Sequence, residues 1–174
     1  MSVFILGIAL GGCGKDGEDA IEINHFEYKG VDYAVSQGAI VNEGKFDGTG
    51  YLMNVAFISS SFTMVETDGV LDSLRGIGNG IGFPLYSSSS DKLAIGTYQY
   101  DETSSENSGT FDDGSFILNY NVSTDEGTEV FIEGGTVTVK QNDTEYEITF
   151  DCTTDTGEKV TGYYKGVLNY YDEQ

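Results

Sequence analysis

The sequence predicts a single all-β domain, either an antiparallel β-sandwich or a flattened up-and-down barrel of roughly 8–10 strands. Glycine makes up 24 of the 174 residues, about twice its usual share, and Pro84 is the only proline. The 12 Tyr and 10 Phe residues, together with many Thr, suit strands more than helices. Several segments alternate between apolar and polar side chains, the period-2 pattern of a half-buried strand.

The first expected strands form a hairpin. Residues 21–28 alternate, Lys29-Gly30 is a turn signal, and a second alternating stretch follows over 31–35. A Gly-rich loop is expected over 42–50. Further strands of the first half are expected, in chain order, over 39–41, 51–57 and 76–86.

Two segments of the first half carry more specific expectations. Residues 66–75 are polar, with Leu71 and Leu74 three positions apart, which fits one helical turn. Pro84 has no N–H to donate to a neighbouring strand, so it predicts an edge strand that is kinked or bulged. The Gly-rich run before Pro84 lacks the G-x-G-x-x-G spacing of a dinucleotide site.

The second half of the chain predicts a meander of hairpins, with turns rich in Asp, Asn, Thr and Gly. Strands are expected, in chain order, over 93–100, 116–122, 130–140, 145–152 and 158–171. Consecutive hairpins favour neighbours in chain order, as in a flattened, lipocalin-like barrel. The polar loop at 101–109 allows the chain to cross between two sheets, so a sandwich stays equally open.

The first 13 residues read as an export and anchoring signal. The apolar run over 3–10 is shorter than the roughly 20 residues of a membrane-spanning helix and has the length of a signal-peptide core. No Lys or Arg precedes it, so we expect the natural start to lie further upstream. We therefore divide the chain into a signal peptide (1–12), a lipidated Cys13 with a polar tether (13–20) and one β domain (21–174). The alternative is a buried N-terminal strand that ends in Gly-Gly-Cys.

Several motifs carry a resemblance to a known group. Leu10-Gly11-Gly12-Cys13 is similar to the lipobox of bacterial lipoproteins, and the acidic residues after it are similar to a surface-export signal. Four later segments look like a recurring pattern: Gly96-Thr97-Tyr98, Gly135-Thr136-Val137-Thr138-Val139, Glu147-Ile148-Thr149-Phe150 and Val160-Thr161-Gly162-Tyr163-Tyr164-Lys165-Gly166. Together they resemble Bacteroidetes-type outer-membrane lipoproteins of uncharacterised function. The resemblance implies that Cys13 is diacylated and becomes the mature N-terminus. It implies an all-β domain at the outer membrane, facing the surface or the periplasm, and it supplies no catalytic residues.

The strong negative charge of the chain limits the kinds of partner that it can bind. With 29 acidic and 8 basic residues, the chain has a formal net charge of -21. Such a surface repels phosphate backbones, which argues against nucleic-acid binding. It also has no attraction for anionic lipid, so membrane attachment must come from the acyl chains. The expected partners are the membrane, through the lipid anchor, and a glycan or protein ligand.

The sequence offers little catalytic chemistry. His25 is the only histidine, so a Ser-His-Asp arrangement or a zinc site is not favoured. The acidic turns at 112–114 and 124–127 lack the spacing of a calcium loop, and we expect no cofactor and no metal. We therefore expect a non-enzymatic binding or structural module. The alternative is a carboxylate-based glycan-processing or glycan-binding accessory protein, because the many acidic residues offer numerous carboxylate pairs.

Once Cys13 is assigned to lipid, Cys152 stands alone. Its position in an alternating segment places it on the same face as Ile148 and Phe150. We therefore expect a buried, unpaired and unreactive thiol.

The tyrosines near the C-terminus give a candidate ligand surface. Adjacent residues of a strand point to opposite faces, so one member of each pair, Tyr163/Tyr164 and Tyr170/Tyr171, should be exposed. In an unbroken strand Leu168 shares a face with Tyr164 and Tyr170, which predicts that this face is core. Tyr163 and Tyr171 are then the exposed pair and the candidate ligand surface.

Overall fold

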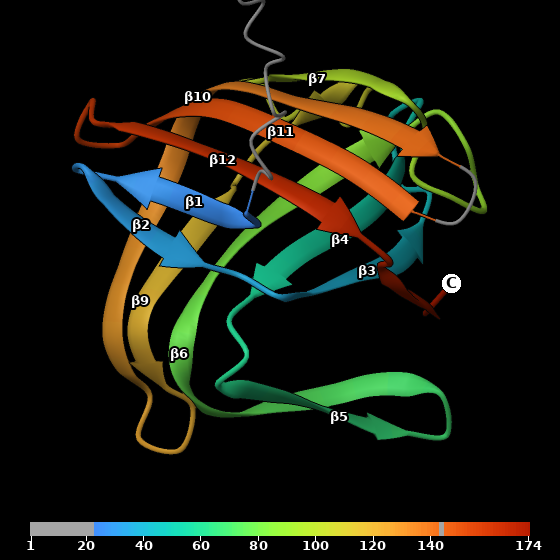
Figure 1. Cartoon of the computed structure of the whole chain (residues 1–174). Helices are drawn as coiled ribbons and strands as arrows, with labels where there is room; N and C mark the ends of the chain where they lie inside the picture. Colours follow the sequence, from blue (N-terminus) through green and yellow to red (C-terminus); the bar gives the residue numbers. More distant parts are fainter. Residues whose placement is uncertain (1–22, 143–144) are drawn as a thin grey trace, which may run out of the picture.

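The structure is a computed structural model that describes residues 23–142 and 145–174, and within these residues it is all-β, with thirteen strands and no helix (Figure 1). The strands are β1 (His25–Tyr28), β2 (Val31–Ala34), β3 (Gln37–Gly44), β4 (Tyr51–Ile58), β5 (Phe62–Thr67), β6 (Val70–Ser87), β7 (Gly96–Tyr100), β8 (Thr110–Phe111), β9 (Ser115–Asn121), β10 (Glu126–Asn142), β11 (Glu145–Thr154), β12 (Lys159–Gly166) and β13 (Asn169–Asp172). The predicted fold class is confirmed. The strand count exceeds the prediction because the expected strand over 158–171 is two strands, residues 62–75 form an extra hairpin, and the short strand β8 was not expected.

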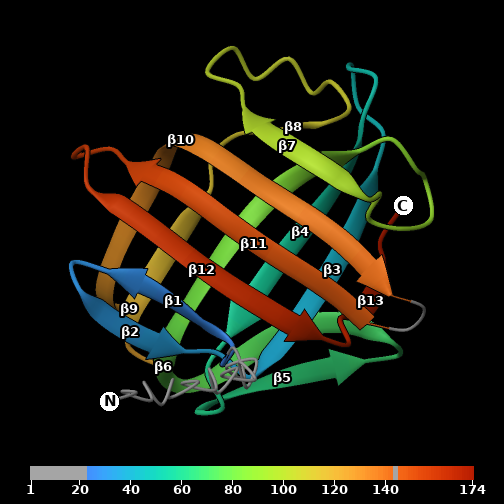
Figure 2. The same cartoon turned by 45° about the horizontal axis from the view of Figure 1, so that its top comes forward.

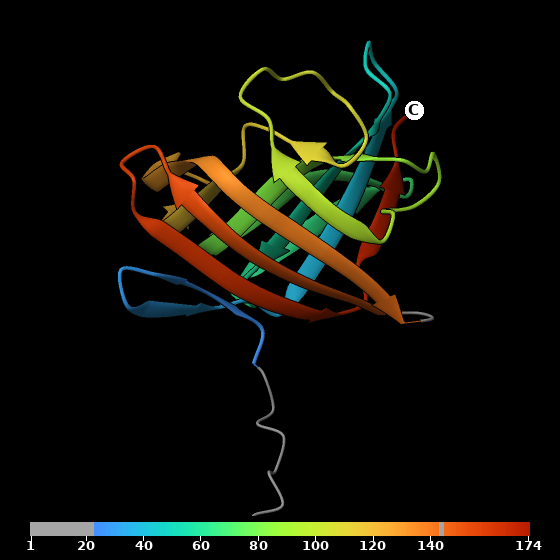
Figure 3. The same ribbon diagram turned by 90° about the horizontal axis from the view of Figure 1, so that it is seen from above.

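The strands form two walls that face each other across the core (Figures 1 and 3). One wall contains β3, β4, β6 and β9, and the other contains β7, β11, β12, β1 and the second half of β10. The walls are joined because β9 pairs with β6 on one side and with the first half of β10 on the other. The result is a flattened barrel whose walls pack like a sandwich.

Two glycines let β10 turn the corner between the walls. The strand pairing shifts register between Ile132 and Gly134, and Gly135 has a φ of 104°. A Cβ atom on Gly135 would lie 2.3 Å from the carbonyl oxygen of Asp151, so no larger residue fits without a backbone shift. A bulge of this kind bends a strand and increases its twist.

Aromatic rings from the two walls meet and fill the interior. Phe57 of β4 stacks on Tyr164 of β12 with ring centroids 4.5 Å apart, and Phe83 of β6 lies 5.1 Å from Phe150 of β11. Phe116 of β9 similarly lies 5.6 Å from Phe26 of β1. Such pairs contribute about 0.5–1.5 kcal/mol each beyond the burial of their area.

The side chains of Tyr164 and Leu168 approach β3 closely at Gly38. A Cβ atom on Gly38 of β3 would lie 3.1 Å from the Tyr164 ring and 2.3 Å from the Leu168 side chain. Glycine therefore permits the close approach of the two walls. After Leu168 the chain turns into β13, which pairs with β3 in parallel (Figure 2).

Turn residues account for two hairpins. Lys29 and Gly30 both have positive φ, as a two-residue type I′ turn requires, and they join β1 to β2 as predicted. Asp68 and Gly69 form the same kind of turn between β5 and β6. The helical turn expected over 66–75 is therefore wrong: this segment holds the end of one strand, a turn and the start of another, because Asp-Gly is a strong hairpin signal.

The prediction that Pro84 marks an edge strand is also wrong. Strand β6 lies inside the sheet, and Pro84 pairs with Asn54 of β4. On its other side β9 pairs only up to Gly82, and β8 pairs only from Leu85. Pro84 therefore occupies a local gap in the pairing, where a missing N–H costs nothing.

The proposed signal peptide, Cys13 and the tether lie outside the described residues. Within residues 23–142 and 145–174 no helix is long and apolar enough to cross a membrane.

Candidate functional site

The candidate site is a row of side chains on the outer surface of the second wall. The strand register places six residues side by side on neighbouring strands: Thr97, Thr138, Thr149, Tyr163, His25 and Ala34. We call this set the outer row. Neighbouring strands lie about 4.8 Å apart, so the row is on the order of 24 Å long.

The residues of the outer row face outward because inward and outward side chains alternate along the strands that carry them. On β10 and β11 the residues next to Thr138 and Thr149 are Val137, Val139, Ile148 and Phe150, all of which point into the core. The threonines and Tyr163 are therefore turned outward, where they are half-buried by their neighbours. The hydroxyls of Thr97 and Thr138 lie 3.2 Å apart, within hydrogen-bonding distance, which confirms that they share the outer face.

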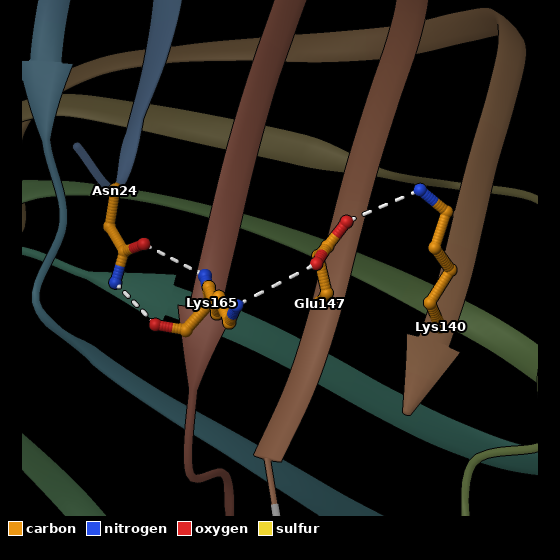
Figure 4. A network of polar contacts seen from close by, with 4 residues as sticks. All are labelled: Asn24, Lys140, Glu147 and Lys165. Atoms are coloured by element: carbon orange, nitrogen blue, oxygen red, sulfur yellow. Dashed lines mark hydrogen bonds and ion pairs between the residues drawn. The ribbon is translucent and has the colours of Figure 1, made fainter. Parts of the chain in front are cut away.

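Charged residues flank the row. On one side Glu147 of β11 lies 3.2 Å from the Lys140 ammonium and 3.9 Å from that of Lys165 (Figure 4). The Asn24 side chain binds the backbone of Lys165 on the same side of the row. It accepts a hydrogen bond from the Lys165 N–H at 2.8 Å and donates one to the Lys165 carbonyl oxygen at 3.0 Å. On the other side of the row, Lys159 pairs with Asp151 at 3.0 Å.

One end of the row opens into a hollow of about 330 Å³ lined by Ile23, His25, Asp32 and Ala34. The His25 Nδ1 atom lies 2.6 Å from the Ile23 carbonyl oxygen. Because a carbonyl only accepts, Nδ1 carries the proton, and Nε2 of the neutral ring is left as an acceptor. This Nε2 lies 3.7 Å from the Asp32 carboxylate, so both groups face the same space.

The other end of the row borders a second hollow of about 230 Å³, beside the start of β7. Its lining includes Thr97, the hydroxyl residues Ser88 and Ser108, and the exposed Ile95. The outer row therefore runs between two hollows.

The row contains no Asp, Glu, Lys or Arg, although the chain carries a net charge of -21. Its hydroxyl groups both donate and accept hydrogen bonds, and Tyr163 adds an aromatic ring. Such an arrangement can hold a neutral, polar ligand, because the six residues offer hydrogen bonds and apolar contact, and the Glu147 and Asp151 carboxylates beside them are paired with lysines.

The exposure of the C-terminal tyrosines differs from the prediction at two positions. Tyr164 is buried and Tyr163 faces outward, as expected. Tyr171, however, is only 4% exposed, whereas Tyr170 is 41% exposed. The expected strand is broken at Val167–Leu168, so the alternation does not continue from Tyr163 to Tyr171.

Tyr171 is buried because a hairpin covers it. Its register partner Val41 lies on the face of β3 opposite the core residue Ile40, so Tyr171 points away from the barrel interior. The hairpin of β5 and β6 lies over this position, and the Tyr171 hydroxyl donates to Glu66. Burial, with the neighbouring Glu66 carboxylate, raises the pKa of Tyr171 to about 12. Tyr171 is therefore removed from the candidate ligand surface, and Tyr163 remains.

The expectation for Cys152 is confirmed. Cys152 is 1% exposed, is not in a disulfide, and shares the core with Ile148 and Phe150. Burial raises the pKa of its thiol to about 12, so almost no thiolate exists near neutral pH.

Asp112 is the buried carboxylate closest in character to a catalytic acid. It is 5% exposed, and burial, followed by the nearby charge of Asp113, raises its pKa. The Tyr86 hydroxyl donates to it at 3.3 Å. The low exposure and the contact with Tyr86 of β6 make this carboxyl group part of the protein interior. Among the described residues, no group of three or more His, Cys, Asp or Glu side chains is placed to hold a metal ion.

The sequence predicted Tyr163 as a site residue, but it did not predict the other five residues of the outer row. The polar Thr136 and Thr138 alternate with Val137 and Val139, which signals an outward-facing hydroxyl stripe on one strand. The register that aligns Thr97, Thr149 and His25 with this stripe joins segments far apart in the chain, and no local pattern encodes it.

Comparison of the chain with protein-family models, with curated proteins and with solved structures finds no match.

Proposed function

We propose that this protein is a non-enzymatic binding module, held at the outer membrane by acyl chains on Cys13, that binds its ligand on the outer row. The anchor rests on the sequence Leu10-Gly11-Gly12-Cys13 and on its resemblance to a lipobox. The ligand surface rests on one observation: an outward-facing row without Asp, Glu, Lys or Arg that has Tyr163 near its centre and a hollow at each end.

The filled interior supports binding on the outer surface instead of inside the barrel. Phe26, Phe57, Phe83, Phe111 and Phe116 are each no more than 2% exposed and occupy the space between the walls. In barrels that hold a ligand internally, that space is a cavity.

The geometry favours binding over glycan processing. Glycoside hydrolysis needs two carboxyl groups about 5–9 Å apart that reach the scissile bond from a cleft. Asp112 has the raised pKa of a proton donor, but it is only 5% exposed and accepts a hydrogen bond from Tyr86.

The test is an array that carries neutral glycans, acidic glycans and unmodified peptides, probed with the lipidated chain in detergent. We expect one of these classes to bind, and we expect Tyr163→Ala to weaken that binding about tenfold or more, because aromatic side chains anchor binding sites. Phe46→Ala is the matched control, since it removes an exposed ring from the loop between β3 and β4. Failure of every class to bind, or equal affinity of Tyr163→Ala and the wild type, would overturn the proposal.

A further inference from the structure

We infer that the ligand of the outer row is a neutral, linear oligosaccharide whose terminal sugar enters the hollow beside His25 and Asp32. This inference rests on the proposed function and adds the ligand class and its direction on the surface.

The chemistry of the row matches a chain of hydroxyl groups. Thr97, Thr138 and Thr149 each present a hydroxyl that can donate one hydrogen bond and accept others. Sugar hydroxyls have the same dual character, so each contact can be satisfied in either direction. Tyr163 supplies a flat ring for the apolar C–H face of one sugar.

The charges select against other ligands. An anionic chain would meet a protein with a net charge of -21. A cationic chain would meet no acidic side chain among the six residues of the row, because the Glu147 and Asp151 carboxylates beside it are paired with lysines and the Asp32 carboxylate lies in the hollow at its end. A protein partner would need an apolar patch with several anchors, whereas the row contains one large ring.

The shape favours an extended chain. The six aligned residues form a strip about 24 Å long across six strands, and residues at its two ends line the hollows, His25 and Ala34 one of them and Thr97 the other. A chain lying along the strip therefore contacts every strand from β7 to β2.

The hollow beside His25 is suited to a terminal sugar. Its volume of about 330 Å³ is at the lower end of the range for small-molecule pockets. Ile23 and Ala34 provide apolar contact, whereas His25 Nε2 and the Asp32 carboxylate provide acceptors that converge on the same space. A carboxylate can accept from two neighbouring hydroxyls at once, which gives this end the greater specificity.

The test is calorimetric titration of the lipidated chain in detergent with neutral cello-, malto-, xylo- and chito-oligosaccharides, from disaccharide to hexasaccharide. For one series, affinity should rise with length until the chain spans the row and then level off. Asp32→Asn should weaken binding about tenfold or more, the loss of one charge-assisted contact. Asp72→Asn, the same charge change on an exposed residue of β6, should leave affinity unchanged.

A second pair of variants tests the row itself. Thr149→Val removes one hydroxyl at constant shape and should weaken binding several-fold, whereas Thr63→Val on the exposed face of β5 should not. Failure of every neutral series to bind, while an acidic glycan or a peptide binds in a Tyr163-dependent way, would overturn this inference and leave the proposed function standing. Neutral oligosaccharides that bind wild type, Tyr163→Ala and Asp32→Asn equally would overturn both.

Discussion

Burial shifts the pKa values of two single side chains in this protein, Cys152 and Asp112. The thiol of Cys152 is 1% exposed, and desolvation raises its pKa to about 12. The carboxyl of Asp112 is 5% exposed, and desolvation raises its pKa as well. In both cases a low-dielectric environment penalises the charged form. For Cys152 the neutral thiol is left unreactive, whereas for Asp112 the ionised carboxylate lowers the stability of the folded state.

We expect a thiol reagent to label Cys152 slowly in the native protein and rapidly after unfolding, because only the thiolate reacts and burial suppresses it. The rate of labelling with and without denaturant measures this, on a Cys13→Ser background so that Cys152 is the only thiol. Rapid labelling of native protein would contradict the register of β11.

We expect Asp112→Asn to keep or raise the free energy of unfolding at pH 7. The raised folded pKa means that Asp112 favours the folded state when protonated, and this contribution is lost as the pH rises through the folded pKa. Asparagine still accepts the Tyr86 hydrogen bond but carries no charge, so its advantage should disappear at about pH 3, below the usual Asp pKa.

The check on Asp112 is urea unfolding at both pH values, with Asp72→Asn as control. Asp72 is an exposed residue of β6, so its replacement should have little effect on stability. A strongly destabilised Asp112→Asn protein at pH 7 would show that the charge is needed.

We expect Cys13→Ser to leave the protein without lipid and outside the membrane fraction, because Cys13 is the residue that the lipobox-like sequence offers for acylation. Fractionation followed by mass spectrometry measures this. Persistence of the variant in the detergent phase with a lipid attached would contradict the anchor.

At the scale of elements, glycines permit contacts that no other residue allows. Gly162 of β12 lies directly opposite Phe150 of β11, whose ring covers it. A Cβ atom at Gly162 would lie 2.2 Å from the Phe150 ring and 2.7 Å from the His25 carbonyl oxygen. The same glycine therefore serves the core packing of β11 and the close pairing with β1.

We expect Gly162→Ala to lower the free energy of unfolding by about 1–3 kcal/mol, the usual cost of overpacking a core. Gly82→Ala is the control, since its added Cβ would meet its nearest atom at 3.5 Å, an ordinary contact. Chemical denaturation of the two variants separates strain at Gly162 from the general effect of removing a glycine. Equal stabilities would refute the close approach of Phe150.

At the scale of the whole molecule, one continuous core holds the two walls together. Its buried residues come from both walls and include the cross-wall pairs of Phe57 with Tyr164 and Phe83 with Phe150. This core supplies the hydrophobic stabilisation of the domain.

We therefore expect the thermal unfolding midpoint to be nearly the same with and without a chelator, because we expect the packing of the core, and not a bound ion, to hold the two walls together. Scanning calorimetry measures this on one preparation, with added calcium as the matching control. A fall of ten degrees or more in chelator, on the order of 2 kcal/mol for a protein of this size, would reveal a structural ion.

Local sequence determined the class of the fold, several of its turns and the faces of its longer strands. Period-2 alternation over 145–152 placed Cys152 in the core, and Lys29-Gly30 specified a hairpin, because both signals act between residues close in the chain. Alternation over the expected strand 158–171, with Leu168 assigned to the core, predicted that Tyr163 faces outward and Tyr164 inward, and both assignments hold within β12.

Only the tertiary structure decided how distant segments combine. Tyr171 is buried because the hairpin of β5 and β6, about 100 residues earlier in the chain, covers it, and Pro84 is tolerated inside the sheet because β8 and β9 leave a gap there. The outer row likewise exists because strand register aligns Thr97, Thr149 and His25. Register between distant strands is set by the packing of the whole core, which no short stretch of sequence contains.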